Sequence, residues 1–166
     1  MSYVPKRHRC YLKSKDAKKL TVDIFEKIGI EIKQFFESKV RVESYEIDAF
    51  TVFLFNGNPL FAKSNNNLFF TLIFEEIFSL FPKVVVDMGA IPYVCKGANV
   101  MAPGIREIQG EFNKNKLLLI VDERHGKPLA VGLALFASEE MKKIKRGKVI
   151  KTLHYVGDRL WDSLKA

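Results

Sequence analysis

The residues of this chain that could act as nucleophile or general base are few and scattered. They are three histidines and two cysteines, namely His8, His125, His154, Cys10 and Cys95. Nucleophilic catalysis needs a nucleophile, a base and an orienting group close together, and no spacing in the sequence brings Cys95 and His154 near each other. We therefore expect these side chains to be structural, and we predict that the protein is not an enzyme.

Three aspartates could be imagined as a carboxylate set: Asp87, Asp122 and Asp158. Capping and turn roles account for each of them, so no catalytic residues are assigned. The two cysteines stand in unrelated surroundings, which argues against a zinc site and for free thiols in a reducing compartment. No phosphate-loop or dinucleotide glycine motif is present. We expect no metal and no cofactor, and a cytoplasmic protein without membrane partners.

A binding site is indicated instead between residues 84 and 105. Residues 84–86 are a β-branched run typical of a buried strand, and Asp87 follows where a helix N-cap is expected. Gly97 is placed to end the helix in the left-handed conformation, and Pro92 keeps that helix short. The segment therefore predicts a strand, a brief helix and a tight return.

Two corners of this segment carry little side chain. Gly97-Ala98 forms one and Pro103-Gly104 the other, and both would let bare backbone approach a ligand. Tight packing explains such glycines equally well, so binding and structural roles both remain open here. Tyr93 precedes Gly97 by four residues and could either stack on a base or pack in the core.

The charge balance favours an anionic partner. The chain has 27 Lys and Arg against 19 Asp and Glu, which gives a net charge of +8 and a pI near 9.5. This excess of positive charge would suit binding to RNA, binding to acidic lipid, or solubility alone. One cluster of cations lies near the N-terminus, at Lys6, Arg7, Arg9, Lys13, Lys15, Lys18 and Lys19, and it could contact phosphates or be a solvated face. Another consists of Lys142, Lys143, Lys145, Arg146, Lys148 and Lys151.

Before Pro82 the pattern predicts helices followed by a hairpin. A helix is expected over residues 14–28, capped by Ser14 or Asp16 and ended by Gly29. A second helical stretch near residues 32–36, strands over 41–48, 50–55 and 60–62, and an apolar helix over 68–80 buried between two halves complete this part.

After Pro82 the elements are short. We expect strands at residues 84–86, 117–121, 129–137 and 148–155, with a helix over 138–144. Trp161 and Tyr155 are expected to close the resulting structure. Short strands with little helix indicate a small barrel.

The order of motifs in this second part resembles the PUA domain, an RNA-binding module named after pseudouridine synthases and archaeosine transglycosylases. The segments that carry the resemblance are Gly89-Ala90, Gly97-Ala98, Val100, Pro103-Gly104-Ile105, 108–112, 127–135 and 154–161. Glu111 stands where the family usually has Asp, and Phe112 comes early. The His154-Tyr155 entry and Leu-Trp exit resemble the small translation-associated PUA proteins, the family of malignant T-cell amplified sequence, which includes stand-alone archaeal members.

The resemblance implies an α+β fold, with an N-terminal α/β domain over residues 1–81 and a C-terminal PUA β-pseudobarrel over 82–166. It implies RNA binding without catalysis, in a translation accessory factor at the small ribosomal subunit or the tRNA acceptor end, with a SUI-domain protein as a possible partner. An RNA-binding accessory subunit of a tRNA- or rRNA-modifying enzyme is the alternative. The RNA-binding residues expected from the corners, the resemblance and the second cluster are Tyr93, Lys96, Gly97, Ala98, Asn99, Pro103, Gly104, Arg106, Lys145, Arg146, Lys148 and Lys151.

Overall fold

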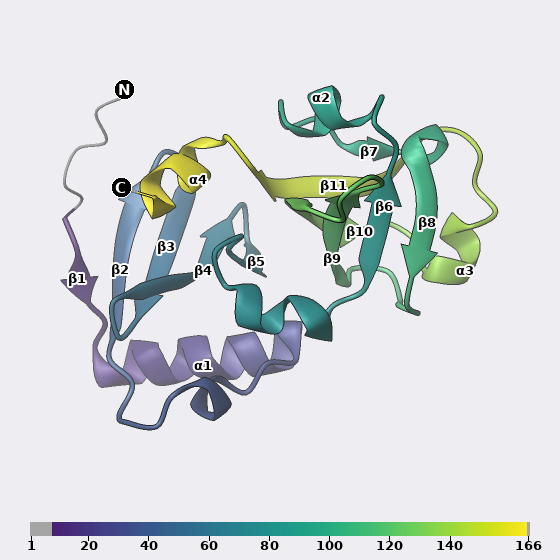
Figure 1. The fold of residues 1–166 in the computed structure, drawn as a ribbon. Coiled ribbons are helices and arrows are strands. Elements are labelled where there is room, and N and C mark those ends of the chain that lie inside the picture. The colour runs from purple at the N-terminus through teal and green to yellow at the C-terminus, as the bar shows by residue number, and fades with distance from the viewer. Residues whose placement is uncertain (1–7, 166) are drawn as a thin grey trace.

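The computed structural model describes residues 8–165, which form two halves, each built on a β-sheet (Figure 1). The first half contains β1 (Cys10–Tyr11), α1 (Ser14–Ile28), η1 (Ile32–Phe35), β2 (Val42–Ile47), β3 (Phe50–Phe55), β4 (Asn58–Ser64), β5 (Asn67–Phe70) and η2 (Glu75–Leu80). Its five strands are antiparallel and lie in chain order. Local hairpins therefore build the sheet from β2 to β5, whereas β1 pairs with β2 across the intervening α1 and η1.

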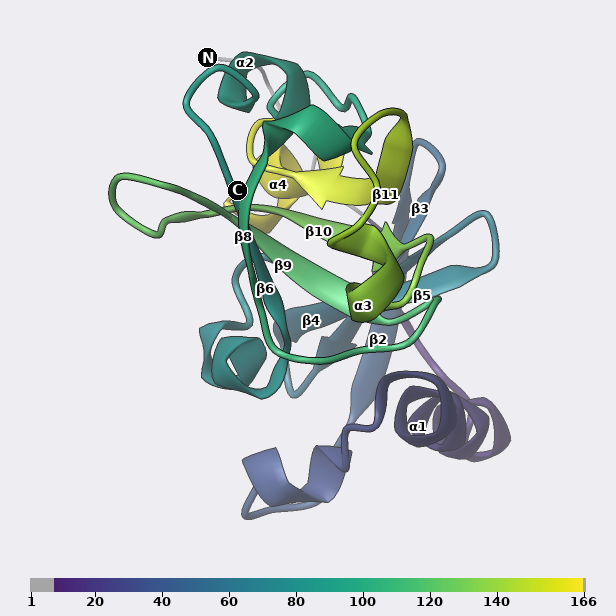
Figure 2. The ribbon, with the colours of Figure 1, turned by 90° about the vertical axis from the view of Figure 1, so that its right-hand side faces the viewer.

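The second half curls its strands into a half-barrel (Figure 2). Its elements are β6 (Lys83–Val86), α2 (Ile91–Val94), β7 (Val100–Met101), η3 (Ala102–Gly104), β8 (Ile105–Gln109), β9 (Leu117–Asp122), β10 (Pro128–Ala134), α3 (Ser138–Met141), β11 (Lys148–Tyr155) and α4 (Arg159–Leu164). The strand order is β7-β11-β10-β9-β6-β8, and β6 runs parallel to β9. The expected α+β class with a C-terminal PUA-type barrel is confirmed.

Helix α1 forms where the apolar period predicts it. Leu20, Ile24 and Ile28 are buried on one face, and Gly29 ends the helix with φ of 82°. The N-cap prediction was wrong, because Lys13 occupies that position and no side chain caps the helix. The helix is therefore held by its buried face rather than by a terminal side chain.

The segment after residue 64 differs from its prediction. Asn65 and Asn66 both have positive φ, as a type I′ turn requires, and they join β4 to β5. Leu68 pairs with Lys63 where a helix was expected, and only η2 is helical. The expected burial is correct for residues 68–70, which are buried on both faces of their strand and so show no apolar–polar alternation, but it is wrong for Glu75, Glu76 and Leu80, which are exposed. Periodicity alone does not separate such a strand from a buried helix.

The two halves share one apolar core. Phe61, Phe69 and Phe74 of the first half belong to the same buried cluster as Leu119 and Val131 of the second. A second cluster, confined to the half-barrel, includes Val84, Leu118 and Ile150. Because the core is shared, the first half is packed directly against the barrel and fixes its position, and the two halves are not joined by a linker alone.

The C-terminal helix α4 crosses back onto the first half. The hydroxyl groups of Tyr45 and Ser163 lie 2.9 Å apart, and Arg159 Nε donates to Asp48 Oδ2 at 2.9 Å. Trp161 is carried on this helix and packs against the shared core. It was expected to close the barrel, and it lies instead where the chain joins the two halves.

A buried histidine stands at the same junction. His154 Nε2 accepts from the backbone N–H of Leu72 at 3.2 Å, and Nδ1 lies 2.8 Å from Asp158 Oδ2. These partners define the neutral tautomer with the proton on Nδ1. The structural role expected for His154 is thus to join β11 to the segment that follows β5.

No helix among residues 8–165 is long and apolar enough to span a bilayer.

Candidate nucleic-acid interface

Local hydrogen bonds at both ends of helix α2 fix its position after β6. Asp87 Oδ1 accepts from the N–H of Ala90 at 2.8 Å, which closes the turn before the helix. The prediction of Asp87 as the helix N-cap was wrong, because Ala90 occupies that position and the aspartate forms the preceding turn instead. At the other end the Gly97 N–H donates to Val94 at 3.0 Å, and the Ala98 N–H donates to Tyr93 at 3.0 Å. This pair of bonds is the Schellman pattern. The left-handed end predicted for Gly97 is confirmed, since its φ is 90°.

The glycine corner is packed closely on β11. A Cβ at Gly97 would lie 2.9 Å from the ring of Tyr155, so the position excludes a side chain on steric as well as backbone grounds. Gly104 makes a comparable approach, because a Cβ there would lie 3.1 Å from that of Ala90. The carbonyl of Gly104 accepts from the N–H of Asp87 at 2.9 Å. Both corners therefore meet at the carboxyl end of β6.

The loop between α2 and β7 is fixed to the sheet through one residue of β11. The N–H of Thr152 donates to Asn99 Oδ1 at 3.0 Å, and its hydroxyl donates to the carbonyl of Ala98 at 2.8 Å. Because Oδ1 takes the backbone donor, the orientation of the Asn99 amide is defined. Within residues 8–165 no protein group accepts from its Nδ2, so this N–H₂ group is available to a ligand.

A hollow of about 620 Å³ lies between these corners. Its lining consists of Asp87, Gly89, Ala90, Tyr93, Val94, Ala98, Asn99, Val100, Met101, Pro103, Gly104 and Lys148. The lining is mainly apolar, and Tyr93 and Met101 are 68% and 49% exposed. Exposed apolar side chains around a recess mark a contact site. A flat, partly apolar ligand such as an unpaired base matches this surface.

Six of the twelve residues predicted to bind RNA line this hollow. They are Tyr93, Ala98, Asn99, Pro103, Gly104 and Lys148. Two others, Lys96 and Gly97, belong to the loop that forms one wall. The structure thus brings the two corners and one cation of the second cluster together.

The remaining predicted cations differ in exposure and in whether their charge is already compensated. Lys145 and Arg146 are exposed just before β11, where the Gly147 carbonyl accepts from the N–H of Ala102 at 2.9 Å. Arg106 Nε lies 3.1 Å from Glu123 Oε2, so part of its charge is already compensated. Lys151 is half-buried on β11, opposite Leu133 of β10. Lys145 and Arg146 are therefore the better placed of these four to meet phosphates near Lys148.

Sequence reasoning missed half of the lining. Asp87, Gly89, Ala90, Val94, Val100 and Met101 were not assigned to binding. Met101 stands out in the structure as an exposed methionine in a two-residue strand, but nothing in the sequence marks it. The others are ordinary core or turn residues, and they line the hollow only because α2 and β7 lie next to each other in the fold.

The three aspartates considered for catalysis serve the backbone. Asp122 accepts from the N–H groups of His125, Lys127 and Arg124, at 2.6, 2.9 and 2.9 Å. The bond from His125, followed by those from the other two, holds the pKa of the Asp122 carboxyl below its ordinary value. Asp87 and Asp158 likewise cap turns. These carboxylates therefore form local turns and not a reactive set.

Cys95 is a partly buried free cysteine at the end of α2. Burial raises the pKa of its thiol above the ordinary value, which disfavours the nucleophilic thiolate. No group of three or more His, Cys, Asp or Glu side chains in the described part of the chain is arranged to hold a metal ion.

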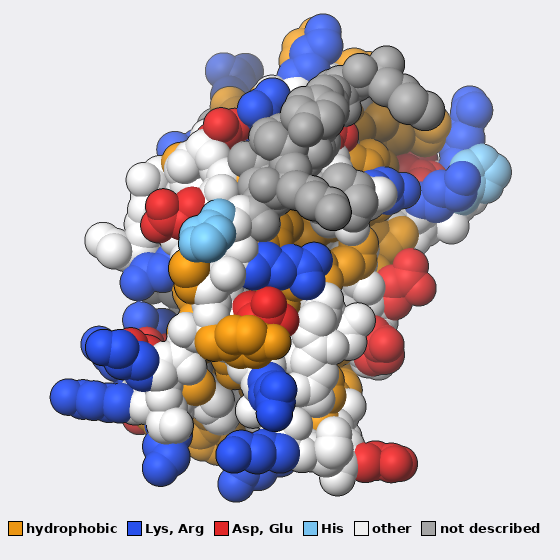
Figure 3. Space-filling model, turned by 90° about the vertical axis from the view of Figure 1, so that its left-hand side faces the viewer, with side chains coloured by type: hydrophobic (Ala, Val, Ile, Leu, Met, Phe, Trp, Pro, Cys, Tyr) orange, Lys and Arg blue, Asp and Glu red, His pale blue; other side chains and the backbone are white. Residues whose placement is uncertain are grey.

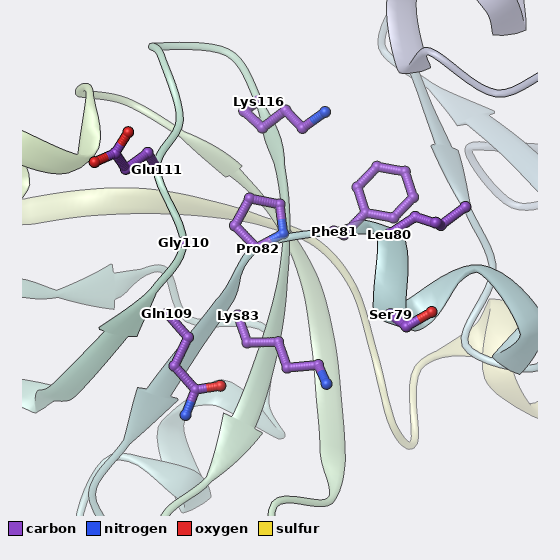
Figure 4. Close-up of a pocket in the computed structure, with 9 residues that line it drawn as sticks. All are labelled: Ser79, Leu80, Phe81, Pro82, Lys83, Gln109, Gly110, Glu111 and Lys116. Atoms are coloured by element: carbon purple, nitrogen blue, oxygen red, sulfur yellow. The ribbon is translucent and has the colours of Figure 1, made fainter.

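A second hollow, of about 480 Å³, lies at the junction of the two halves (Figure 4). It is lined by Ser79, Leu80, Phe81, Pro82, Lys83, Gln109, Gly110, Glu111 and Lys116. The ammonium of Lys116 lies 5.2 Å from the centre of the Phe81 ring, so it is partly engaged. Glu111 also lines the hollow, with its carboxylate directed away from Lys83 and Lys116 (Figure 4), and no residue predicted to bind RNA lines it. It is a weaker candidate for a polyanion than the recess at α2.

Comparison with known proteins matches the two halves of the structure to two different families. Residues 82–156 match the PUA domain, and residues 6–74 match a domain of unknown function, DUF1947. An uncharacterized protein of Methanocaldococcus jannaschii is 36% identical over 94% of this chain and 96% of its own length. Translation machinery-associated protein 20 of Saccharomyces cerevisiae is 29% identical over 83% of this chain and 81% of its own.

Other relatives extend the comparison. A probable tRNA pseudouridine synthase B of Pyrobaculum arsenaticum is 30% identical over 82% of this chain, which spans 42% of that protein. The crystal structure of a hypothetical protein from Pyrococcus horikoshii superposes with a TM-score of 0.76 at 30% identity, over 95% of this chain and 99% of that one. With a PUA domain in its second half, a DUF1947 region in its first and a near-full-length archaeal relative at 36% identity, the chain belongs to the family of PUA-domain proteins that includes this archaeal protein.

Proposed function

We propose that this protein is an RNA-binding accessory factor of translation that performs no chemistry of its own. The observation that carries the proposal is the recess at α2, with glycine-walled corners, exposed Tyr93 and Lys148 at its edge, in a PUA domain. An unpaired base can stack on an aromatic ring and be held by backbone and amide groups, whereas a base inside a duplex cannot. Lysines beside the recess would neutralise the adjoining phosphates. Unpaired nucleotides at the tRNA acceptor end or in rRNA loops are the class of ligand that fits.

A role at the small ribosomal subunit, in the cytoplasm, is supported by the relatives whose names place them with the translation machinery. A SUI-domain partner belongs to the same proposal. The test is co-sedimentation of the wild-type protein with purified small and large ribosomal subunits, and binding to tRNA with and without its unpaired acceptor end. Binding to small subunits and loss of affinity on removing that end are expected. Absence of any small-subunit or tRNA binding would refute the proposal.

A second candidate is an accessory role in tRNA or rRNA modification. It is favoured by the similarity to a probable tRNA pseudouridine synthase, most of whose length lies outside the matched region. The two candidates separate in a deletion strain, where a deficit of a modified nucleoside with normal small-subunit association supports the second.

The cations beside the recess should control the salt dependence of RNA binding. Changing Lys145, Arg146 and Lys148 together to alanine removes up to three phosphate contacts. We expect the slope of log affinity against log salt to become shallower by roughly 2, at about 0.7 per contact for single-stranded RNA. Fluorescence anisotropy on tRNA from low to high salt measures the slope.

The matched control changes Lys33, Lys114 and Lys127 to alanine, because these exposed lysines lie in three separate places. The net charge falls equally in both variants. If both shift the slope by the same amount, the effect belongs to overall charge and the cations near β11 are not contacts.

A further inference from the structure

A second basic surface lies on the first half, along β1 and the start of α1. Arg9, Tyr11 and Lys13 alternate along the chain at β1, and all three are exposed. Arg9 precedes the two-residue strand and Lys13 follows it, so each cation is two residues from Tyr11 along the chain. Tyr11 is 66% exposed, although the strand pairs with β2 through Cys10 and Tyr11.

The helix continues this surface. Lys15, Lys18 and Lys19 are exposed, on the side of α1 away from the buried Leu20 and Ile24. Spacings of three and four residues set side chains on one helix face. Figure 3 shows Lys and Arg side chains gathered over the lower part of this side of the molecule. We define the N-terminal basic face as Arg9, Tyr11, Lys13, Lys15, Lys18 and Lys19; Lys6 and Arg7 lie outside the described residues.

The charges of this face are not compensated. Among residues 8–165, ion pairs involve Arg106, Lys142, His154 and Arg159, and none involves a cation of the N-terminal basic face. Asp16 is the one acidic residue between Arg9 and Lys19. The nearby carboxylates are Glu43, opposite Tyr11 on β2, and Asp16 and Asp23, which line a hollow together with Lys19. Five cations that are in no ion pair therefore outnumber three carboxylates, which leaves this face with an excess of positive charge.

We propose that the N-terminal basic face binds the phosphate backbone of an RNA segment, with Tyr11 stacked on one of its bases. The inference rests on the proposed RNA-binding function and assigns a second contact surface to it. Cations on both sides of an exposed aromatic are the pattern of single-strand binding, in which the ring holds a base and the cations hold the flanking phosphates. An acidic protein would match the charges, but it would leave the ring of Tyr11 without a specific partner.

The two RNA surfaces lie on different halves of the molecule. Helix α2 and β7 lie at the top of the second half in Figure 1, whereas β1 lies at the left and α1 at the bottom of the first half. Since the halves share one core, the surfaces are held at a fixed separation. One long RNA can therefore engage both, and its affinity gains from the second contact, whereas a short oligonucleotide can occupy only one surface at a time.

The test compares a tRNA with a single-stranded oligonucleotide of about six nucleotides that carries the tRNA acceptor-end sequence. Changing Lys13, Lys15, Lys18 and Lys19 to alanine should lower affinity for the tRNA at least about tenfold and reduce its salt slope by roughly 2 to 3. Affinity for the oligonucleotide should stay within about twofold of wild type. Tyr11→Ala should weaken tRNA binding by roughly tenfold without changing the salt slope, because the ring is uncharged. Alanine favours the helix at Lys15, Lys18 and Lys19, and Tyr11 and Lys13 are exposed, so the variants should remain folded.

The Ala98→Glu change at the recess and the dispersed Lys33, Lys114 and Lys127 variant serve as controls. The inference is overturned, and the proposed function kept, if Ala98→Glu weakens tRNA binding while the N-terminal variants bind tRNA like wild type. It is overturned in the same way if the N-terminal variants keep wild-type tRNA binding and lose only the capture of an acidic protein. If wild type itself binds neither RNA, the proposed function fails.

Discussion

Replacing Ala98 by glutamate should lower RNA affinity at least about tenfold, or roughly 1.4 kcal/mol, while leaving the fold intact. Ala98 is exposed on the wall of the recess, and only its backbone is engaged, through the N–H to Tyr93 and the carbonyl to Thr152. The new carboxylate would stand where a sugar or phosphate is expected, close enough to repel it. Since no apolar contact of the core is lost, the free energy of unfolding should change by less than about 1 kcal/mol. Anisotropy with labelled tRNA and thermal unfolding measure the two quantities.

The matched control is Ala49→Glu, the same change at an exposed alanine between β2 and β3. It should leave RNA affinity near that of wild type. A folded Ala98→Glu protein that binds RNA as tightly as the control would show that the recess is structural and that RNA is held elsewhere.

Changing Asp158 to alanine should destabilise the whole protein by about 3 kcal/mol. The buried carboxylate accepts from His154 Nδ1 at 2.8 Å, from the N–H of Tyr155 at 3.0 Å and from the N–H of Trp161 at 2.6 Å. Removing it strands the Nδ1–H of a fully buried ring and uncaps α4. Because α4 joins the second half to the first, the loss should lower a single cooperative transition. Urea unfolding followed by circular dichroism measures the change.

Asp162→Ala is the control for this effect. Asp162 is exposed in the first turn of the same helix, and its loss should cost no more than about 0.5 kcal/mol. Equal stability of the two variants would mean that the His154–Asp158 pair does not hold the halves together.

Some of the candidate site could be predicted from the sequence because it depends on local chemistry. The left-handed end of α2 follows from Gly97, since a residue with a Cβ pays for that conformation. The turn at Asp87 follows from a short polar side chain placed directly after a strand, although the helix itself begins only after Ala90. Local rules of this kind need no knowledge of the remaining chain.

The error at residues 68–80 has a physical reason. A run buried on all sides has no apolar period, so the signal that separates strand from helix is absent. The choice is made by β4, whose Phe61 and Lys63 offer backbone partners to Phe70 and Leu68. Pairing between strands is a tertiary fact even when the turn that permits it, Asn65-Asn66, is local.

By itself the sequence determined which face of α1 is buried and where the glycine corners and the type I′ turn at Asn56-Gly57 lie. It also determined the excess of positive charge. Each of these features follows from residue type and near-neighbour spacing. Only the tertiary structure decided that Met101 and Lys148 join these corners in one recess, and that Arg106 is held by Glu123. The packing of α4 against β2, through the hydroxyl groups of Ser163 and Tyr45, was likewise decided only by the tertiary structure. These contacts join residues far apart in the chain, and their partners are selected by the shared core rather than by any local preference.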